Sequence, residues 1–199
     1  MFFAAYTGVV VGEIAGLRVS DLNLLARTAR IERSAQYVGG SWHVGTPKSR
    51  AGPRTVDGLP RDLIADLAAL VALLRPTDYV FGWLDGDGVS HPYNRANFLR
   101  RVFDPALAAL GMPTHRNSGG FGMHDLRHFH GSLCIERGMT PIQVAKRLGH
   151  ADATLVLKLH AHAWEQHPDE LTETSDASVA AGKAAVRHTP TVVSLRSAR

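Results

Sequence analysis

The sequence predicts a mostly α-helical domain that carries one small antiparallel β-sheet. Apolar residues recur at helical spacing in several segments, and a Gly-Gly pair separates two short strand-like runs. The chain has 199 residues, 45% of them hydrophobic, which is enough for one domain with its own core. We expect this domain to occupy residues 1–164. Residues 165–199, rich in Ala, Ser, Thr and charge, are expected to be a weakly ordered tail or to pack against a neighbouring protomer.

The first part of the chain is expected to hold two helices and the sheet. Residues 1–18 have apolar positions at helical spacing and are expected to form one helix. A second helix is expected to begin at Pro60 and to reach about Arg75, with Leu63, Leu67, Leu70 and Leu74 on one face. Between the two helices, a Gly39–Gly40 turn and a polar connection join three strand-like runs. These runs cover residues 27–38, 41–47 and 54–56.

The second part of the chain predicts a short strand followed by four helices. The strand is expected over 79–83, and the first helix over 92–110. The second helix should run from Met123 to Arg137, since Gly138 is suited to end it. Thr140 and Gln143 form a capping box with Pro141 at the first helical position, which starts a helix that ends at Gly149. Asp152 is expected to cap a last helix that reaches about Trp164.

Composition narrows the possible partners and compartment. Lys and Arg number 22 against 18 acidic residues, and the resulting charge of +4 suits a polyanionic partner. The single cysteine, Cys134, cannot form an internal disulfide, which agrees with a reducing cytoplasm. No apolar run approaches the roughly 20 residues that span a bilayer, so we expect a cytoplasmic protein with no membrane partner.

The segment with the clearest chemistry is Met123-His124-Asp125-Leu126-Arg127-His128. His124 and Arg127 are three residues apart, so on a helix they lie on the same face. An imidazole beside a guanidinium can hold a phosphate oxygen and relay a proton. Such a pair alone is also common on helix surfaces, but three further segments accompany it. They are Thr7-Gly8 with Glu13 and 17–22, the hairpin residues 48–54, and Leu148-Gly149-His150.

In this order, over residues 5–164, the segments resemble the signature of the catalytic domain of tyrosine recombinases, the phage-integrase family. The resemblance implies DNA strand exchange without a metal or other cofactor, through attack of a tyrosine on a DNA phosphate. It further implies roles for four residues of this chain. Lys48 would be the general acid, His124 and Arg127 the phosphate-binding pair, and His150 the second histidine.

Two positions depart from the family pattern. Val10 stands where the family has an arginine, and a valine cannot donate a hydrogen bond to phosphate. His160 occupies the position of the nucleophilic tyrosine, and the four tyrosines of the chain all lie far upstream. We therefore expect strand cleavage to be impaired. Attack on phosphorus by the His160 imidazole is the alternative that keeps covalent chemistry.

Complete members of the family also carry an N-terminal helical domain that grips DNA. This chain begins almost at the catalytic signature, so we expect a truncated domain with weak, non-specific affinity for double-stranded DNA, and homo-oligomers could form on that DNA. Arg50 and Arg54 are expected either to contact DNA phosphates or to be solvated hairpin charges. Glu13 is expected to buttress a helix, with Arg18 as the candidate partner.

Two other functions remain open at this stage. One is a non-enzymatic DNA-binding or regulatory protein that uses the same fold. The other is a metal-dependent phosphohydrolase built on the histidine-rich region, because His124 and His128 have the spacing of metal ligands on a helix. No motif supplies a third ligand, although His130, His162 and His167 lie in the same half of the chain.

Overall fold

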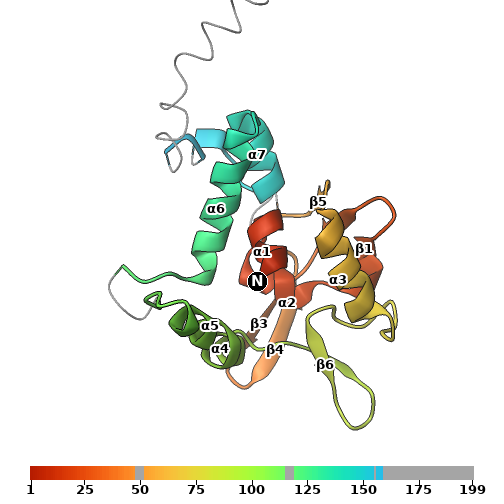
Figure 1. Cartoon of the computed structure of the whole chain (residues 1–199). Helices are drawn as coiled ribbons and strands as arrows, with labels where there is room; N and C mark the ends of the chain where they lie inside the picture. Colours follow the sequence, from red (N-terminus) through yellow and green to blue (C-terminus); the bar gives the residue numbers. More distant parts are fainter. Residues whose placement is uncertain (48–51, 115–118, 155, 159–199) are drawn as a thin grey trace, which may run out of the picture. The chain divides into compact units, whose positions relative to one another are not determined.

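The computed structural model describes residues 1–47, 52–114, 119–154 and 156–158, all within one compact unit, Met1–His160 (Figure 1). The unit is rich in helices and carries small antiparallel sheets, which confirms the predicted fold class. The prediction of a single sheet is wrong, because the strands among these residues form three separate small sheets. Among the described helices, none has the length and apolarity needed to cross a membrane.

The N-terminal region forms two short helices instead of the single helix expected over residues 1–18. Helix α1 covers Phe2–Thr7 and helix α2 covers Val11–Gly16. Gly8 ends α1 in the left-handed conformation, with φ 66°, and its N–H bonds to the Ala4 carbonyl. A Cβ at Gly8 would overlap the side chains of Leu148 and His130. Glycine is therefore required at this turn by both its backbone angle and its close packing.

The strands pair in an order that the sequence did not indicate. The expected strand over 27–38 breaks at Glu32–Arg33, where the Arg33 guanidinium turns to the buried Asp21 carboxylate at 2.5 and 2.6 Å. Its two halves enter different sheets. One sheet has the order β1-β2-β5 (Leu22–Asn23, Thr28–Ile31, Arg54–Val56); the others are the hairpins β3-β4 (Ser34–Val38, Ser41–Gly45) and β6-β7 (Gly82–Leu84, Ser90–Pro92).

The Gly39–Gly40 turn is confirmed as the connection of the β3-β4 hairpin, in which Val38 pairs with Ser41. Strand β5, however, pairs with β2, and Arg54 lies opposite Ile31. The 3-10 turn η1, Val19–Asp21, leads into β1. This pairing brings the start of β5 back to the region of α2.

The central and C-terminal helices largely follow the sequence prediction. Helix α3 begins after Pro60 as expected but ends before Arg75. The helix expected over 92–110 begins later than predicted, after its cap Asn94, and contains a π-helical part, η2. The last two helices, α6 and α7, end within one residue of the predicted positions. The bounds are α3 Arg61–Val71, α4 Arg95–Phe98, η2 Leu99–Phe103, α5 Asp104–Ala109, α6 Met123–Glu136 and α7 Pro141–Leu148.

The caps at α7 are also confirmed. The Thr140 hydroxyl accepts from the Gln143 N–H at 3.4 Å, and Gly149 takes the left-handed conformation with φ 75°. Asp152 accepts from the Thr154 N–H at 2.8 Å, as expected for the start of a further helix. Its predicted extension to Trp164 lies outside the described residues.

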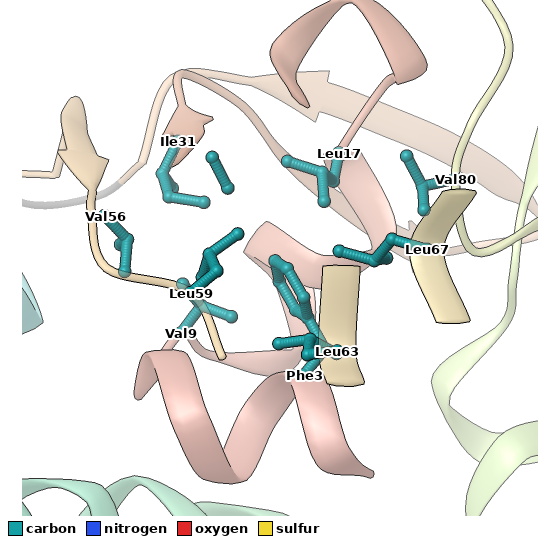
Figure 2. Packing of buried hydrophobic residues seen from close by; sticks show 10 residues of the cluster. Phe3, Val9, Leu17, Ile31, Val56, Leu59, Leu63, Leu67 and Val80 are labelled. Carbon is teal, nitrogen blue, oxygen red and sulfur yellow. The ribbon is translucent and has the colours of Figure 1, made fainter. Parts of the chain in front are cut away.

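The main core lies between the N-terminal helices, the β1-β2-β5 sheet and α3 (Figure 2). Leu63 and Leu67 bring the predicted apolar face of α3 into it, whereas Leu70 of that face is 48% exposed. The cluster contains Phe3, Val9, Leu17, Ala29, Ile31, Val56, Leu59, Leu63, Leu67 and Val80. A second cluster joins η2 and α5 to the start of α6 through Leu99, Phe103 and Leu107, with Phe121, Met123 and Leu126 against them.

These cores fix the elements that carry the candidate site. Helix α6 packs along α1 and contacts α7, as Figure 1 shows. Because Val9 is a core residue, the adjacent Val10 and the start of α2 are held against this framework.

Candidate functional site

A cavity of about 690 Å³ brings together residues from four parts of the chain. The turn before α2, the β3-β4 hairpin, the start of α4 and the start of α6 all contribute to its lining. Val10, Tyr37, Trp42, Arg95, His124 and Arg127 are among the lining residues. The structure therefore places the predicted pair His124 and Arg127 beside Val10, the position that departs from the recombinase pattern.

His124 lies on the first turn of α6 and reaches the cavity from an exposed position. Asp125 fixes that turn by accepting a hydrogen bond from the Gly122 N–H at 2.7 Å. The rings of His124 and His128 meet edge to face, with centroids 4.8 Å apart. Partial burial lowers the pKa of His124 below its ordinary value, and the neighbouring His128 and Arg127 lower it further. The neutral imidazole is thus the main form at pH 7.

Arg127 is buried, with 8% of its surface exposed, and it links two distant turns. Its two terminal nitrogens donate to the Gly8 carbonyl at 2.6 Å and to the Leu148 carbonyl at 2.7 Å. Burial and, to a lesser degree, the charge of Arg54 together lower the pKa of Arg127 to about 10, while Glu13 opposes the change. The guanidinium therefore remains charged at pH 7. Arg127 lines the cavity and also holds the α1–α2 turn to the end of α7.

Arg54 and Glu13 form a buried ion pair that corrects two expectations. Their side chains are 5% and 7% exposed, and two parallel N–H···O bonds of 2.8 and 2.9 Å join them. Arg54 also donates to the carbonyls of Arg147 and Gly52. In this structure Arg54 is therefore a buried structural residue and not the solvated charge that was one expectation from the sequence. Its other expected role, contact with a DNA phosphate, stays a prediction.

Arg18 is not the partner of Glu13. Its guanidinium lies over the Tyr79 ring, 5.3 Å from the centroid, in a cation–π contact. Glu13 instead accepts from Arg54 and from the Val10 N–H at 3.1 Å. The sequence did not indicate Arg54 as the partner, since the pairing of β5 with β2 is what brings Arg54 near α2.

Two buried guanidinium groups hold the C-terminal end of α7. Arg54 donates to the carbonyl of Arg147 at 2.8 Å, and Arg127 donates to the next carbonyl, that of Leu148, at 2.7 Å. The last carbonyls of a helix lack partners within the helix and carry partial negative charge, so cations are favourable there. This arrangement fixes the turn at Gly149 and therefore the backbone of His150, whose N–H bonds to Ala145.

The structure brings the remaining predicted residues together only in part. His150 is half-buried and follows directly on the segment that Arg127 holds, but it is not among the described residues that line the cavity. Lys48, Arg50 and His160 lie outside the described residues. Their predicted roles as general acid, DNA contact and replaced nucleophile stay predictions.

A buried histidine network next to this site was missed at the level of sequence. His130 is 3% exposed; its Nδ1 donates to the Ala5 carbonyl at 3.1 Å and its Nε2 accepts from Arg147 at 2.9 Å. Arg147 also donates to Asp57 at 2.8 Å. Burial, aided by the charge of Arg147, lowers the pKa of His130 to about 4. The three-residue spacing from Arg127 was the available signal, because it places both side chains on the same face of α6.

This network bears on the metal alternative. Both ring nitrogens of His130 have hydrogen-bond partners. Within the described ranges, no group of three or more His, Cys, Asp or Glu side chains is arranged to hold a metal ion. His162 and His167 lie outside those ranges.

Comparison with known proteins gives relatives of one kind. The chain is 31% identical over 167 residues to the protein named as prophage phiRv2 integrase of Mycobacterium tuberculosis, covering 82% of this chain and 41% of the relative. It is 25% identical over 179 residues to the integrase of Staphylococcus phage L54a, covering 85% of this chain and 48% of the relative. The chain thus spans less than half the length of these curated relatives. No protein-family model matches it.

Solved structures show the same fold. The Tn1549 transposon integrase in complex with transposon right-end DNA superposes with a TM-score of 0.65 at 17% identity, covering 87% of this chain and 57% of that one. The XerA recombinase superposes with a TM-score of 0.57 at 19% identity, covering 83% of this chain and 56% of that one.

Proposed function

This chain is a relative of the phage integrases and has the fold of a tyrosine-recombinase catalytic domain, and on that premise we propose that it binds double-stranded DNA through phosphate contacts without cleaving it. The cavity residues His124 and Arg127 and the adjoining Leu148–His150 turn form the centre of the proposed contact. Binding is directed at the backbone and depends little on base sequence.

The convergence of His124, Arg127 and the Leu148–His150 turn carries this proposal. His124 and Arg127 lie on α6 and line the cavity, and the turn follows α7. The buried hydrogen bond from Arg127 to the Leu148 carbonyl joins that turn to the cavity residues. A site that handles a phosphate diester is expected to combine residues from such distant parts of the chain. The net charge of +4 also favours a polyanion as partner.

The same cavity supports the loss of strand cleavage. Val10 lines it and can offer neither charge nor a side-chain donor to a phosphate oxygen. Removal of one preorganised donor typically lowers a rate about 10²–10³-fold. The replacement of the nucleophilic tyrosine by His160 removes the usual covalent route as well. The domain is therefore proposed to bind DNA without making a covalent adduct.

A salt titration tests the binding. A fluorescently labelled duplex of about 20 base pairs is mixed with the protein at rising salt concentration. Binding should be weak, and the logarithm of the association constant should fall linearly with the logarithm of the salt concentration. A second duplex of scrambled sequence should bind equally well. Absence of binding to either duplex at about 10 mM salt would contradict the proposal.

The choice of variant follows from the structure. Arg127→Ala is unsuitable as a binding probe, because it would also release the Gly8 and Leu148 carbonyls. His124→Ala removes an exposed side chain at the cavity and should weaken binding at low salt. His91→Ala, on the β6-β7 hairpin, is the control and should bind like the unchanged protein. Equal affinity of the two variants would argue against the cavity as the contact.

A further inference from the structure

The cavity combines a basic group with an aromatic surface. Arg95, on the first turn of α4, lines it from an exposed position. Tyr37 and Trp42, from the two strands of the β3-β4 hairpin, line it as well. Among the described lining residues there is no aspartate or glutamate. A cavity of this composition favours an anion that also has a flat ring.

Arg95 is the group best placed to supply the charge. The terminal nitrogens of Arg127 are bonded to two backbone carbonyls, and His124 is mainly neutral at pH 7. The Asn94 side chain caps α4 by accepting from the Ala96 N–H at 2.9 Å, which fixes the helix start that carries Arg95. Helix α4 in turn packs against α2. The backbone of Arg95 is thus held at the cavity while its long side chain is exposed.

The aromatic surface comes from a cross-strand pair. Tyr37 lies directly opposite Trp42 in the hairpin register, so both side chains project from the same face. Their rings meet edge to face at 5.3 Å, and 49% of Tyr37 is exposed. Aromatic side chains that remain accessible in this way are suited to stack against a nucleobase.

We propose that this cavity binds one nucleotide of DNA that is unpaired, with Arg95 on its phosphate and the Tyr37–Trp42 pair against its base. The proposal rests on the proposed function and adds to it a preference for gapped over intact duplex. The volume of about 690 Å³ lies within the range of about 300–1,000 Å³ typical of pockets for small organic ligands. A base inside an intact duplex is stacked between its neighbours and cannot enter such a pocket unless it is first extruded.

Binding of two labelled DNAs by the full chain tests this directly. One is an intact duplex, and the other is the same duplex with a gap of three nucleotides in one strand. The unchanged protein should bind the gapped DNA about tenfold more tightly at equal salt. Trp42→Ala should bring the two affinities together with little change for the intact duplex, and Trp42→Phe, which keeps an aromatic ring, should retain most of the difference.

Matched controls separate the cavity from general surface effects. Arg95→Ala should weaken binding of the gapped DNA about tenfold, whereas Arg101→Ala, an exposed residue of the next segment η2, should have a much smaller effect. Trp83→Ala changes a tryptophan that is 53% exposed on the β6-β7 hairpin and should leave the gap preference intact. At matched ionic strength, deoxyadenosine monophosphate should compete for the gapped DNA better than inorganic phosphate.

The outcomes distinguish this inference from the proposed function. Equal binding of intact and gapped DNA by the unchanged protein would overturn the nucleotide site and leave duplex binding standing. Equal competition by inorganic phosphate and the nucleotide would overturn the base contact. Failure to bind either DNA at low salt would contradict the proposed function, and the nucleotide site with it.

Discussion

The buried pair Glu13–Arg54 gives the strongest prediction about stability. Glu13→Gln keeps the size of the side chain but removes its charge, which leaves the Arg54 guanidinium buried without a counter-ion. Arg54 is only 5% exposed, and Glu13 also opposes the lowering of the pKa of Arg127. Loss of one partner of a buried pair typically costs about 3–5 kcal/mol. We expect about 3 kcal/mol here, because the glutamine oxygen can still accept one hydrogen bond.

Urea denaturation followed by helical circular dichroism measures this cost. With a slope of about 2 kcal/mol per molar urea, the midpoint should fall by about 1.5 M. Glu32→Gln is the matched control, since Glu32 is 39% exposed and pairs with Arg30 at 3.0 Å; its loss should cost less than about 1 kcal/mol.

A second substitution sharpens the interpretation. Adding Arg54→Met to Glu13→Gln removes the unpaired buried charge, so part of the lost stability should return. Recovery should be incomplete, because the carbonyls of Arg147 and Gly52 then lose their donor. If Glu13→Gln shifts the midpoint no more than Glu32→Gln does, the buried pair does not anchor the site and our reasoning about Arg54 is wrong.

Three other changes test the same framework. The pKa of His130 is lowered from 6.5 to about 4, so between these pH values the unfolded chain binds more protons than the folded one. The contribution of His130 to stability should therefore be fully present above about pH 6.5 and should fall by up to about 3 kcal/mol towards pH 4. Urea midpoints measured across this pH range test it. In His130→Gln that part of the pH dependence should be absent, and an unchanged profile would refute the assignment. Arg127→Lys cannot hold the Gly8 and Leu148 carbonyls in the same two-pronged way and should cost about 1–3 kcal/mol in the same assay, whereas Arg101→Lys should be neutral. Gly8→Ala should lower the thermal midpoint of unfolding, because the left-handed backbone and the overlap with Leu148 both disfavour a Cβ at this position. Gly39→Ala is the control, since Gly39 also has a positive φ but a Cβ there would enter open space. Equal midpoints for the two variants would show that packing around Gly8 contributes nothing.

Local signals in the sequence predicted helices α6 and α7 well, the N-terminal helices less well and the sheets poorly. The capping box at Thr140–Gln143 and the glycines at 138 and 149 depend on neighbouring residues alone, and they mark α6 and α7 correctly. The pairing of β5 with β2 and the break at Arg33 depend on contacts between distant residues. The Arg33 side chain turns towards Asp21, and no local sequence pattern predicts that interaction.

The candidate site follows the same division. The spacing of His124 and Arg127 predicted that they share a face of α6, and both line the same cavity. The role of Arg54 could not be predicted, since its neighbours in sequence give it the character of an exposed hairpin charge. Only the fold shows that Arg54 and Arg127 hold consecutive carbonyls at the end of α7.

Covalent trapping on a nicked suicide duplex, followed by denaturing gel electrophoresis, tests the central claim most directly. The unchanged protein should bind this DNA and form no adduct. Val10→Arg combined with His160→Tyr is expected to recover an adduct, while His160→Tyr alone should give at most a trace and Val10→Arg alone none, because the two groups act as a unit. An adduct formed by the unchanged protein that disappears in His160→Ala would show that histidine is the nucleophile and would contradict the account.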